Sequence, residues 1–219
     1  MSREIPRDVI ARLLRWREHP WNMVEDGAVW TLDSVDLKNP IKKYPNLEYL
    51  KTVSNIWLEA DPPLVAFPKS RRMMMSWLVI LLHLHLAMFN EGSRVYIQSE
   101  KEPKSAELLD RAEFIYDHIP PDLMPGWALP KLRRFKKPPK IEFEKLNSFM
   151  EGVPEGARQL AQFTASAVVM DEAAFWHLGR ESFAALKPTT EGGGRVTVLS
   201  SAQRGWFYNL VYDQADKGL

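Results

Sequence analysis

Apolar and polar positions along the chain follow two different periods. Short runs rich in β-branched and aromatic residues predict strands near residues 64–68, 94–98, 141–149, 166–170 and 195–200. Apolar residues at helical spacing predict helices near 6–18 and 74–89, and a further helix that starts after Ser99. Strands that alternate with helices indicate an α/β fold, with a mainly parallel sheet, helices on both faces and right-handed crossovers. We expect the stretch 141–149 to form an edge hairpin.

The first strand-to-helix step contains a candidate phosphate-binding loop. Residues 67–77 read Phe-Pro-Lys-Ser-Arg-Arg-Met-Met-Met-Ser-Trp. In a P-loop, backbone N–H groups and a helix N-terminus hold phosphates, a Lys reaches the outer phosphates, and a Ser or Thr ligates Mg²⁺. The usual Gly-Lys-Ser/Thr ending is Met74-Met75-Ser76 here, but Lys69 can supply its flexible point charge from the strand end. The alternative is an ordinary strand-helix turn with a basic N-terminus.

Another apolar run ends in two adjacent carboxylates. The residues from Ala165 to Met170 are apolar or small, and Asp171-Glu172 follows directly. In a P-loop enzyme the first acid helps to hold Mg²⁺ through water, and the second orients and polarises the attacking water. Two carboxylates at the end of a central strand are costly unless a cation or hydrogen-bond donors meet them. The pair therefore predicts a metal-site residue, Asp171, and a catalytic carboxylate, Glu172.

Composition narrows the class of protein. The chain has 219 residues, 45% of them apolar, which suits one globular α/β domain. Its net charge is +1, so a basic surface for nucleic acid would have to be local. The absence of Cys excludes disulfides and thiolate metal sites, and makes an intracellular location the simplest expectation. The apolar stretch 78–89 is too short to span a membrane, and His83 and His85 interrupt it.

The order of the motifs resembles the ATPase domain of viral large terminases, the DNA-packaging motors of tailed phages. Lys69-Ser-Arg-Arg-Met-Met-Met-Ser76 is similar to a deviant Walker A motif of that family, which opens with the Lys. Met-Asp-Glu-Ala-Ala-Phe at 170–175 resembles Walker B, and Leu-Ser-Ser-x-x-x-Gly-x-Phe-Tyr at 199–208 resembles the coupling motif. The resemblance begins near Trp30. We therefore expect an N-terminal helical segment at 1–29 and a P-loop ATPase domain at 30–219.

The resemblance implies a motor that hydrolyses ATP with Mg²⁺ and moves double-stranded viral DNA into a procapsid in the host cytoplasm. Implied partners are a small terminase subunit, a portal protein and the procapsid, with no membrane. The active form would be a ring homo-oligomer, and the isolated domain could be a monomer. The implied phosphate-binding residues are Lys69, Ser70, Arg71, Arg72, Met73, Met74, Met75 and Ser76, with Ser76 and Asp171 at the metal. Ser200 and Ser201 would sense the nucleotide state.

One stretch ahead of the phosphate loop allows two interpretations. Tyr44, Pro45 and Tyr49 match a Tyr-Pro-x-x-x-Tyr stretch that terminases carry in this place. They are candidates for an adenine pocket, because an aromatic face can stack on a base. Alternatively, both tyrosines pack the N-terminal helix.

A basic run at 130–140 also allows two interpretations. It holds six Lys or Arg residues and no acid. Such a run suits a loop that contacts a DNA backbone or another subunit, and the candidate DNA residues are Arg133, Arg134, Lys136 and Lys137. A solvated loop ahead of a hairpin is the alternative.

The chain also departs from the terminase pattern. Met74 and Met75 replace Gly and Lys, and Ala161 stands where an Arg commonly precedes the Walker B strand. Arg158 is the nearest replacement, and Arg71 or Arg72 could serve as a cis arginine contact. The metal-dependent nuclease domain of the family is not represented, so we expect no nuclease activity from this chain. Two rival functions stay open: a helicase-like nucleic-acid ATPase, and a degenerate P-loop domain that binds without hydrolysis.

Overall fold

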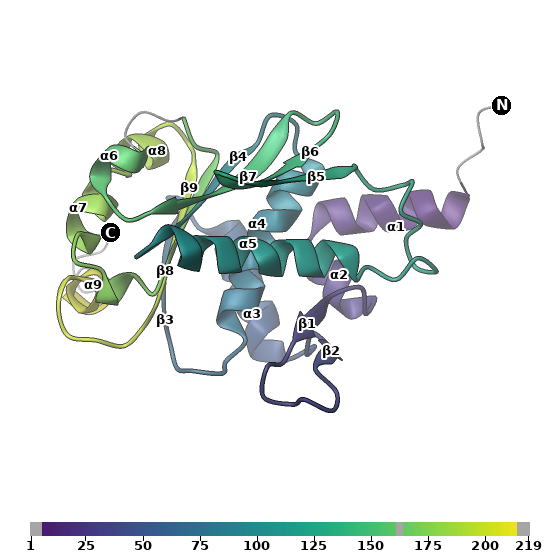
Figure 1. Ribbon diagram of the computed structural model, residues 1–219, viewed down its shortest axis with the longest axis horizontal. Coiled ribbons are helices and arrows are strands. Elements are labelled where there is room, and N and C mark those ends of the chain that lie inside the picture. Colours follow the sequence, from purple (N-terminus) through teal and green to yellow (C-terminus); the bar gives the residue numbers. More distant parts are fainter. Residues whose placement is uncertain (1–5, 161–163, 214–219) are drawn as a thin grey trace.

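The fold is built around a sheet, which Figure 1 shows beside a layer of long helices. The computed structural model describes residues 6–160 and 164–213. Within these residues seven strands form one sheet in the order β3-β9-β8-β4-β7-β6-β5. The strands are β3 (Leu64–Lys69), β4 (Arg94–Ser99), β5 (Leu132–Lys136), β6 (Pro139–Phe143), β7 (Ser148–Pro154), β8 (Ala167–Asp171) and β9 (Arg195–Ser201).

The first five strands in that order are parallel, which confirms the expected α/β fold. β9 pairs in parallel with both β3 and β8, and β4 pairs in parallel with both β8 and β7. The carboxyl ends of β3, β9 and β8 therefore lie next to one another although they are far apart in sequence. In such sheets, ligands bind outside the carboxyl ends of the strands.

Helices and short turns cover both faces of the parallel strands. The helices are α1 (Arg7–Glu18), α2 (Trp21–Glu25), α3 (Glu48–Glu59), α4 (Met75–Phe89), α5 (Glu102–Asp117), α6 (Ala157–Leu160), α7 (Gly179–Ala184), α8 (Lys187–Glu191) and α9 (Trp206–Tyr208), with the turns η1 (Ala173–Phe175) and η2 (Asn209–Asp213). A hairpin of β1 (Trp30–Leu32) and β2 (Ile41–Lys43) stands apart from the main sheet.

Alternate residues of each strand enter two different cores. Val95 and Ile97 of β4 join the larger cluster with α1 to α5, whereas Tyr96 joins the smaller cluster with α7 and α9. Because both faces are covered, the central residues of the parallel strands are mostly apolar on both faces. No helix within the described part of the chain is both long and apolar enough to span a membrane.

Helix α4 runs through the larger core and is buried on nearly every side. His83 Nδ1 donates to the Val79 carbonyl oxygen (2.7 Å), and His85 Nε2 donates to the Trp16 carbonyl oxygen (2.7 Å). Burial lowers the pKa of each histidine to about 4, so both imidazoles are neutral at pH 7. As their spacing indicates, the two side chains pack in the core, and Trp16 ties α1 to the same core.

The antiparallel side of the sheet corrects two expectations. The stretch 141–149 does form a hairpin, because β6 pairs antiparallel with β7, but the hairpin is not at the edge: β5 lies outside β6, and β7 continues to Pro154 beside β4. The basic run at 130–140 is not a loop, because it forms β5 and the turn to β6, with β5 at the sheet edge. The sequence of β5, Leu-Arg-Arg-Phe-Lys, does not alternate between apolar and polar residues, and all but its first residue are exposed. Charged residues are common on edge strands.

Candidate functional site

The loop between β3 and α4 has the backbone of a tight turn made without glycine. Arg72 and Met74 both lie in the left-handed region, with φ of 64° and 57°. For a residue with a Cβ this conformation costs on the order of 1–2 kcal/mol. α4 begins at Met75, directly after this loop. The first N–H groups of a helix have no acceptor within it, so this end of α4 suits an anion.

Two tyrosines hold the strained loop from outside the cavity. The Tyr44 hydroxyl donates to the Met74 carbonyl (3.2 Å), and the Tyr49 hydroxyl donates to the Met73 carbonyl (3.1 Å). Burial raises the pKa of Tyr44, so its hydroxyl stays protonated and remains a donor. The adenine-pocket candidates Tyr44 and Tyr49 thus support the loop backbone in this structure, and they do not line the cavity that contains Lys69, Asp171 and Glu172.

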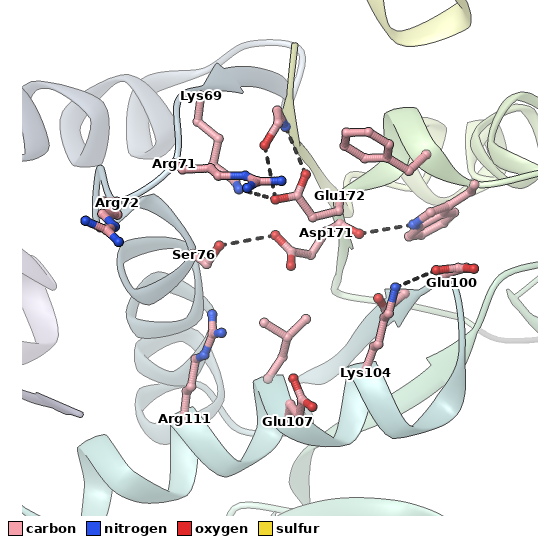
Figure 2. A pocket seen from close by; sticks show the side chains of 15 residues that line it. Lys69, Arg71, Arg72, Ser76, Glu100, Lys104, Glu107, Arg111, Asp171 and Glu172 are labelled. Carbon is pink, nitrogen blue, oxygen red and sulfur yellow. Dashed lines mark hydrogen bonds and ion pairs between the residues drawn. The ribbon is translucent and has the colours of Figure 1, made fainter. Parts of the chain in front are cut away.

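The carboxylates at the end of β8 meet the lysine at the end of β3, as Figure 2 shows. Lys69 Nζ forms an ion pair with Glu172 Oε1, and only 9% of the Lys69 side chain is exposed. Glu172 itself has φ of 53°, which turns its side chain toward β9. Ser76, in the first turn of α4, donates its hydroxyl to Asp171 Oδ1 (3.3 Å).

Two serines of β9 complete the contacts of Glu172. The Ser201 backbone N–H donates to Glu172 Oε2 (2.9 Å), and the hydroxyls of Ser200 and Ser201 lie 3.4 and 3.3 Å from the carboxylate oxygens. Ser200 Oγ also accepts the N–H of Ala174 (3.1 Å), just after the carboxylate pair. The end of β9 is therefore bonded directly to the segment that carries Glu172.

The pKa values of the two neighbouring carboxyl groups are shifted in opposite directions. Burial raises the pKa of Asp171, although the charges of Lys69 and Arg111 oppose it. Burial also raises that of Glu172, but hydrogen bonds from Lys69 and Ser201 outweigh it and hold the pKa below its ordinary value. A cation beside Asp171 would relieve the cost of ionising it.

These residues line one cavity of about 590 Å³. The residues of its wall that the sequence also singles out are Lys69, Arg71, Arg72, Ser76, Asp171, Glu172 and Ser201. The opposite wall comes from the end of β4 and from α5, with Glu100, Lys104, Glu107 and Arg111. Sequence reasoning missed these four residues. Their spacing of three or four along a predicted helix was the available signal, but it does not tell which face meets the cavity.

Several candidate residues lie elsewhere. Ser70, Met73 and Met74 belong to the loop but do not line the cavity, and Met75, the first residue of α4, is buried in the core. Arg158 is exposed on α6, outside the cavity wall. Ala161 and the next two residues lie outside the described part of the chain.

The candidate DNA residues are on and after β5. Arg134 is bonded to Glu113 (2.8 Å) and Asp117 of α5, and Arg133 lies 3.8 Å from Glu144. Lys136 and Lys137 are exposed at the turn to β6. The four cations therefore differ: Arg133 and Arg134 lie beside protein carboxylates, whereas Lys136 and Lys137 have no ion pair with the described residues.

The donor set at the end of β8 fits a Mg²⁺ ion that shares its coordination with phosphates. Asp171 and Ser76 offer one carboxylate and one hydroxyl, and Mg²⁺ commonly takes one or two protein oxygens together with substrate phosphates. No group of three or more His, Asp or Glu side chains that could hold a metal occurs among the described residues. The site thus suits a metal that arrives with its ligand.

The fold and the arrangement of the site define the class: an α/β P-loop NTPase fold. The chain shares this fold with solved phage large terminases. The HK97 bacteriophage large terminase matches with a TM-score of 0.67 and 13% sequence identity, over 92% of this chain and 41% of that one. A variant of the Thermus phage P74-26 large terminase ATPase domain matches with a TM-score of 0.56 and 14% identity, over 76% of this chain and 69% of that one.

A large terminase from a thermophilic bacteriophage, solved with ATP-gamma-S, matches with a TM-score of 0.57 and 13% identity, over 79% of this chain and 43% of that one. The chain thus spans less than half of the length of the HK97 terminase chain and of this one. No protein-family model matches the sequence, and no curated protein matches it either.

Proposed function

We propose that this chain is the ATP-hydrolysing motor domain of a large terminase, which drives double-stranded viral DNA into a procapsid. The observation that carries the proposal is a pair of contacts at the ends of β3 and β8 and the start of α4: Lys69 pairs with Glu172, and Ser76 donates to Asp171. The fold around them is that of terminase ATPase domains. The proposed partners are the DNA, a small terminase subunit, a portal protein and further copies of the chain in a ring, all in the host cytoplasm.

Each residue of the cavity has a role in the proposed reaction. The N-terminus of α4 and the loop from Lys69 to Ser76 bind the phosphates, and Lys69 neutralises charge on the β- and γ-phosphates. Bound at Ser76 and Asp171, Mg²⁺ would supply further neutralisation of the phosphates. Glu172 orients the attacking water and accepts its proton. Arg71 and Arg72 line the same cavity and are candidates for a cis arginine contact.

Glu172 also supports a coupling role for β9. In the structure it bonds Lys69 on one side and Ser200 and Ser201 on the other. A phosphate that draws Lys69 away would change the contacts of Glu172, and through them the position of the β9 end. Ser200 and Ser201 would in this way sense the nucleotide and pass its state to the segment that follows.

The test is phosphate release from ATP, with and without double-stranded DNA, in the wild type and in Glu172→Gln. Loss of a general base typically costs about 10²–10⁴-fold in rate, so we expect a loss in that range while ATP-gamma-S still binds. Glu91→Gln is the control, because Glu91 is exposed at the amino-terminal side of β4. Turnover that survives Glu172→Gln would contradict the assignment.

The same assay separates one rival function. Met74 and Met75, in place of Gly and Lys, favour a domain that binds nucleotide without hydrolysing it. That rival predicts binding of ATP-gamma-S by the wild type together with no turnover in any condition, including in the presence of DNA.

A further inference from the structure

One face of α5 forms the wall of the cavity that lies opposite the phosphate loop. Lys104, Glu107, Leu108 and Arg111 line the cavity and recur at helical spacing, so they share this face. Figure 2 shows the Arg111 side chain rising from α5 toward Ser76 and Asp171. This wall faces the metal-site residues across the cavity, with Leu108 buried and Arg111 partly buried.

Arg111 is the cation of that wall whose hydrogen-bond donors have no acceptor among the described residues. Its guanidinium has no hydrogen bond or ion pair with any residue that the structure describes. The side chain is partly buried, and it lies over the Trp77 ring, with 5.6 Å between Cζ and the ring centroid. Trp77 is in turn held by an edge contact to Phe114, at 5.9 Å. The aromatic pair fixes the stem of Arg111 and leaves its donors directed into the cavity.

The other cation of this wall is different. Lys104 Nζ donates to Glu100 Oε2 at 2.5 Å, one helical turn earlier, so a protein carboxylate already meets its charge. Lys69 is likewise paired with Glu172. Partly buried donors that no protein group meets are costly, unless a ligand supplies the acceptor. Of the two α5 cations that line the cavity, Arg111 is the one that has no acceptor among the described side chains.

We infer that Arg111 binds the terminal phosphoryl group of the nucleotide and so distinguishes a triphosphate from a diphosphate. This inference rests on the proposed function. Asp171, Glu172 and the α5 wall line the same cavity as Lys69 and Ser76. With the inner phosphates at the start of α4, the outermost phosphate would extend toward these residues. A guanidinium offers a fork of donors that matches two phosphate oxygens. A diphosphate has no group that reaches this wall.

The test is calorimetric titration of the Mg²⁺ complexes of ATP-gamma-S and ADP into the wild type, Arg111→Gln and Arg111→Lys. Loss of a charged hydrogen bond corresponds to about 10- to 100-fold in affinity. We expect Arg111→Gln to weaken ATP-gamma-S binding by this factor and ADP binding by less than about twofold. Arg111→Lys, which keeps the charge without the fork, should show an intermediate loss. The control is Lys101→Gln, because Lys101 is 73% exposed and does not line the cavity.

Two results would overturn the inference alone. Equal weakening of both nucleotides would make Arg111 a support of the cavity, and unchanged affinities would remove it from the site. If the wild type binds neither nucleotide, the proposed function itself fails and the inference fails with it. Thermal melts of both variants show whether they fold, and Arg111→Lys decides the question if Arg111→Gln does not.

Discussion

The cations of the cavity and the cations of β5 look alike in the sequence but differ in what surrounds them. In the cavity, Arg71 and Arg111 have no hydrogen bond or ion pair with the described residues. On β5, Arg134 is held by Glu113 and Asp117 of α5. An arginine that is already paired supports the fold, whereas an unpaired arginine in a cavity is available to an anionic ligand. A basic run in the sequence therefore does not measure how many cations are available for binding.

Arg158 extends the comparison to a cation that is exposed and outside the cavity. If the motor is a ring, this side chain on α6 can enter the site of a neighbouring subunit, where a trans arginine is typically worth about 10³–10⁵ in rate. Specific ATPase activity should then rise with protein concentration. Arg158→Ala should remove the rise and leave ATP-gamma-S affinity unchanged, whereas Arg180→Ala, on the neighbouring helix α7, should keep it. A rate that is independent of concentration and unaffected by Arg158→Ala would mean that catalysis is complete in cis.

His85 provides a third case, because its burial in the core disfavours the charged form of its imidazole. Its folded pKa is lowered from 6.5 to about 4, so the unfolded chain binds a proton at a pH where the folded chain does not. This contribution to stability is fully present above pH 6.5 and is lost as the pH falls toward 4. His85→Gln keeps a donor for the Trp16 carbonyl but does not titrate. The pH dependence of the unfolding free energy, from denaturant titrations, should become shallower by up to about 1.4 kcal/mol per pH unit. An identical slope would show that His85 titrates normally.

The smallest effects are expected on β5. Lys136→Ala combined with Lys137→Ala should lower the slope of log affinity for DNA against log salt by about two, because two phosphate contacts are lost. Stability should not change, since both side chains are exposed. Arg134→Ala should do the opposite: it should cost about 1 kcal/mol of stability and leave the slope unchanged. The comparison would be wrong if Arg134→Ala changed the slope as much as the lysine pair does.

The parts of the site that could be anticipated from sequence are those fixed by strand ends. Lys69, Asp171 and Ser201 each terminate a strand, and the strand ends of a parallel sheet meet at one edge, so their approach follows from order alone. The α5 wall could not be anticipated, because the rotation of α5 that brings Arg111 into the cavity is set by tertiary packing against Trp77 and the sheet.

Hydrogen bonds from side chains to the backbone of the loop before α4 could not be anticipated from the sequence either. Tyr44 and Tyr49 looked like base-stacking residues, yet their hydroxyls hold loop carbonyls more than twenty residues away, at Met73 and Met74. The strand β5 could not be anticipated either. What Arg134 contributes there is a pair of ion pairs with Glu113 and Asp117 of α5, and such contacts leave no periodic pattern in the sequence.

The central claim is that Lys69, at the strand end, does the work of the lysine that the loop lacks. The direct measurement is calorimetric titration of Mg²⁺ and ATP-gamma-S into the wild type, Lys69→Ala and Met75→Leu. Met75 is buried in the core and has no charge to offer, so Met75→Leu should bind like the wild type. Lys69→Ala should weaken binding by about tenfold or more, the effect of losing a charge-assisted contact. Equal losses in both variants, or no loss in Lys69→Ala, would contradict the account.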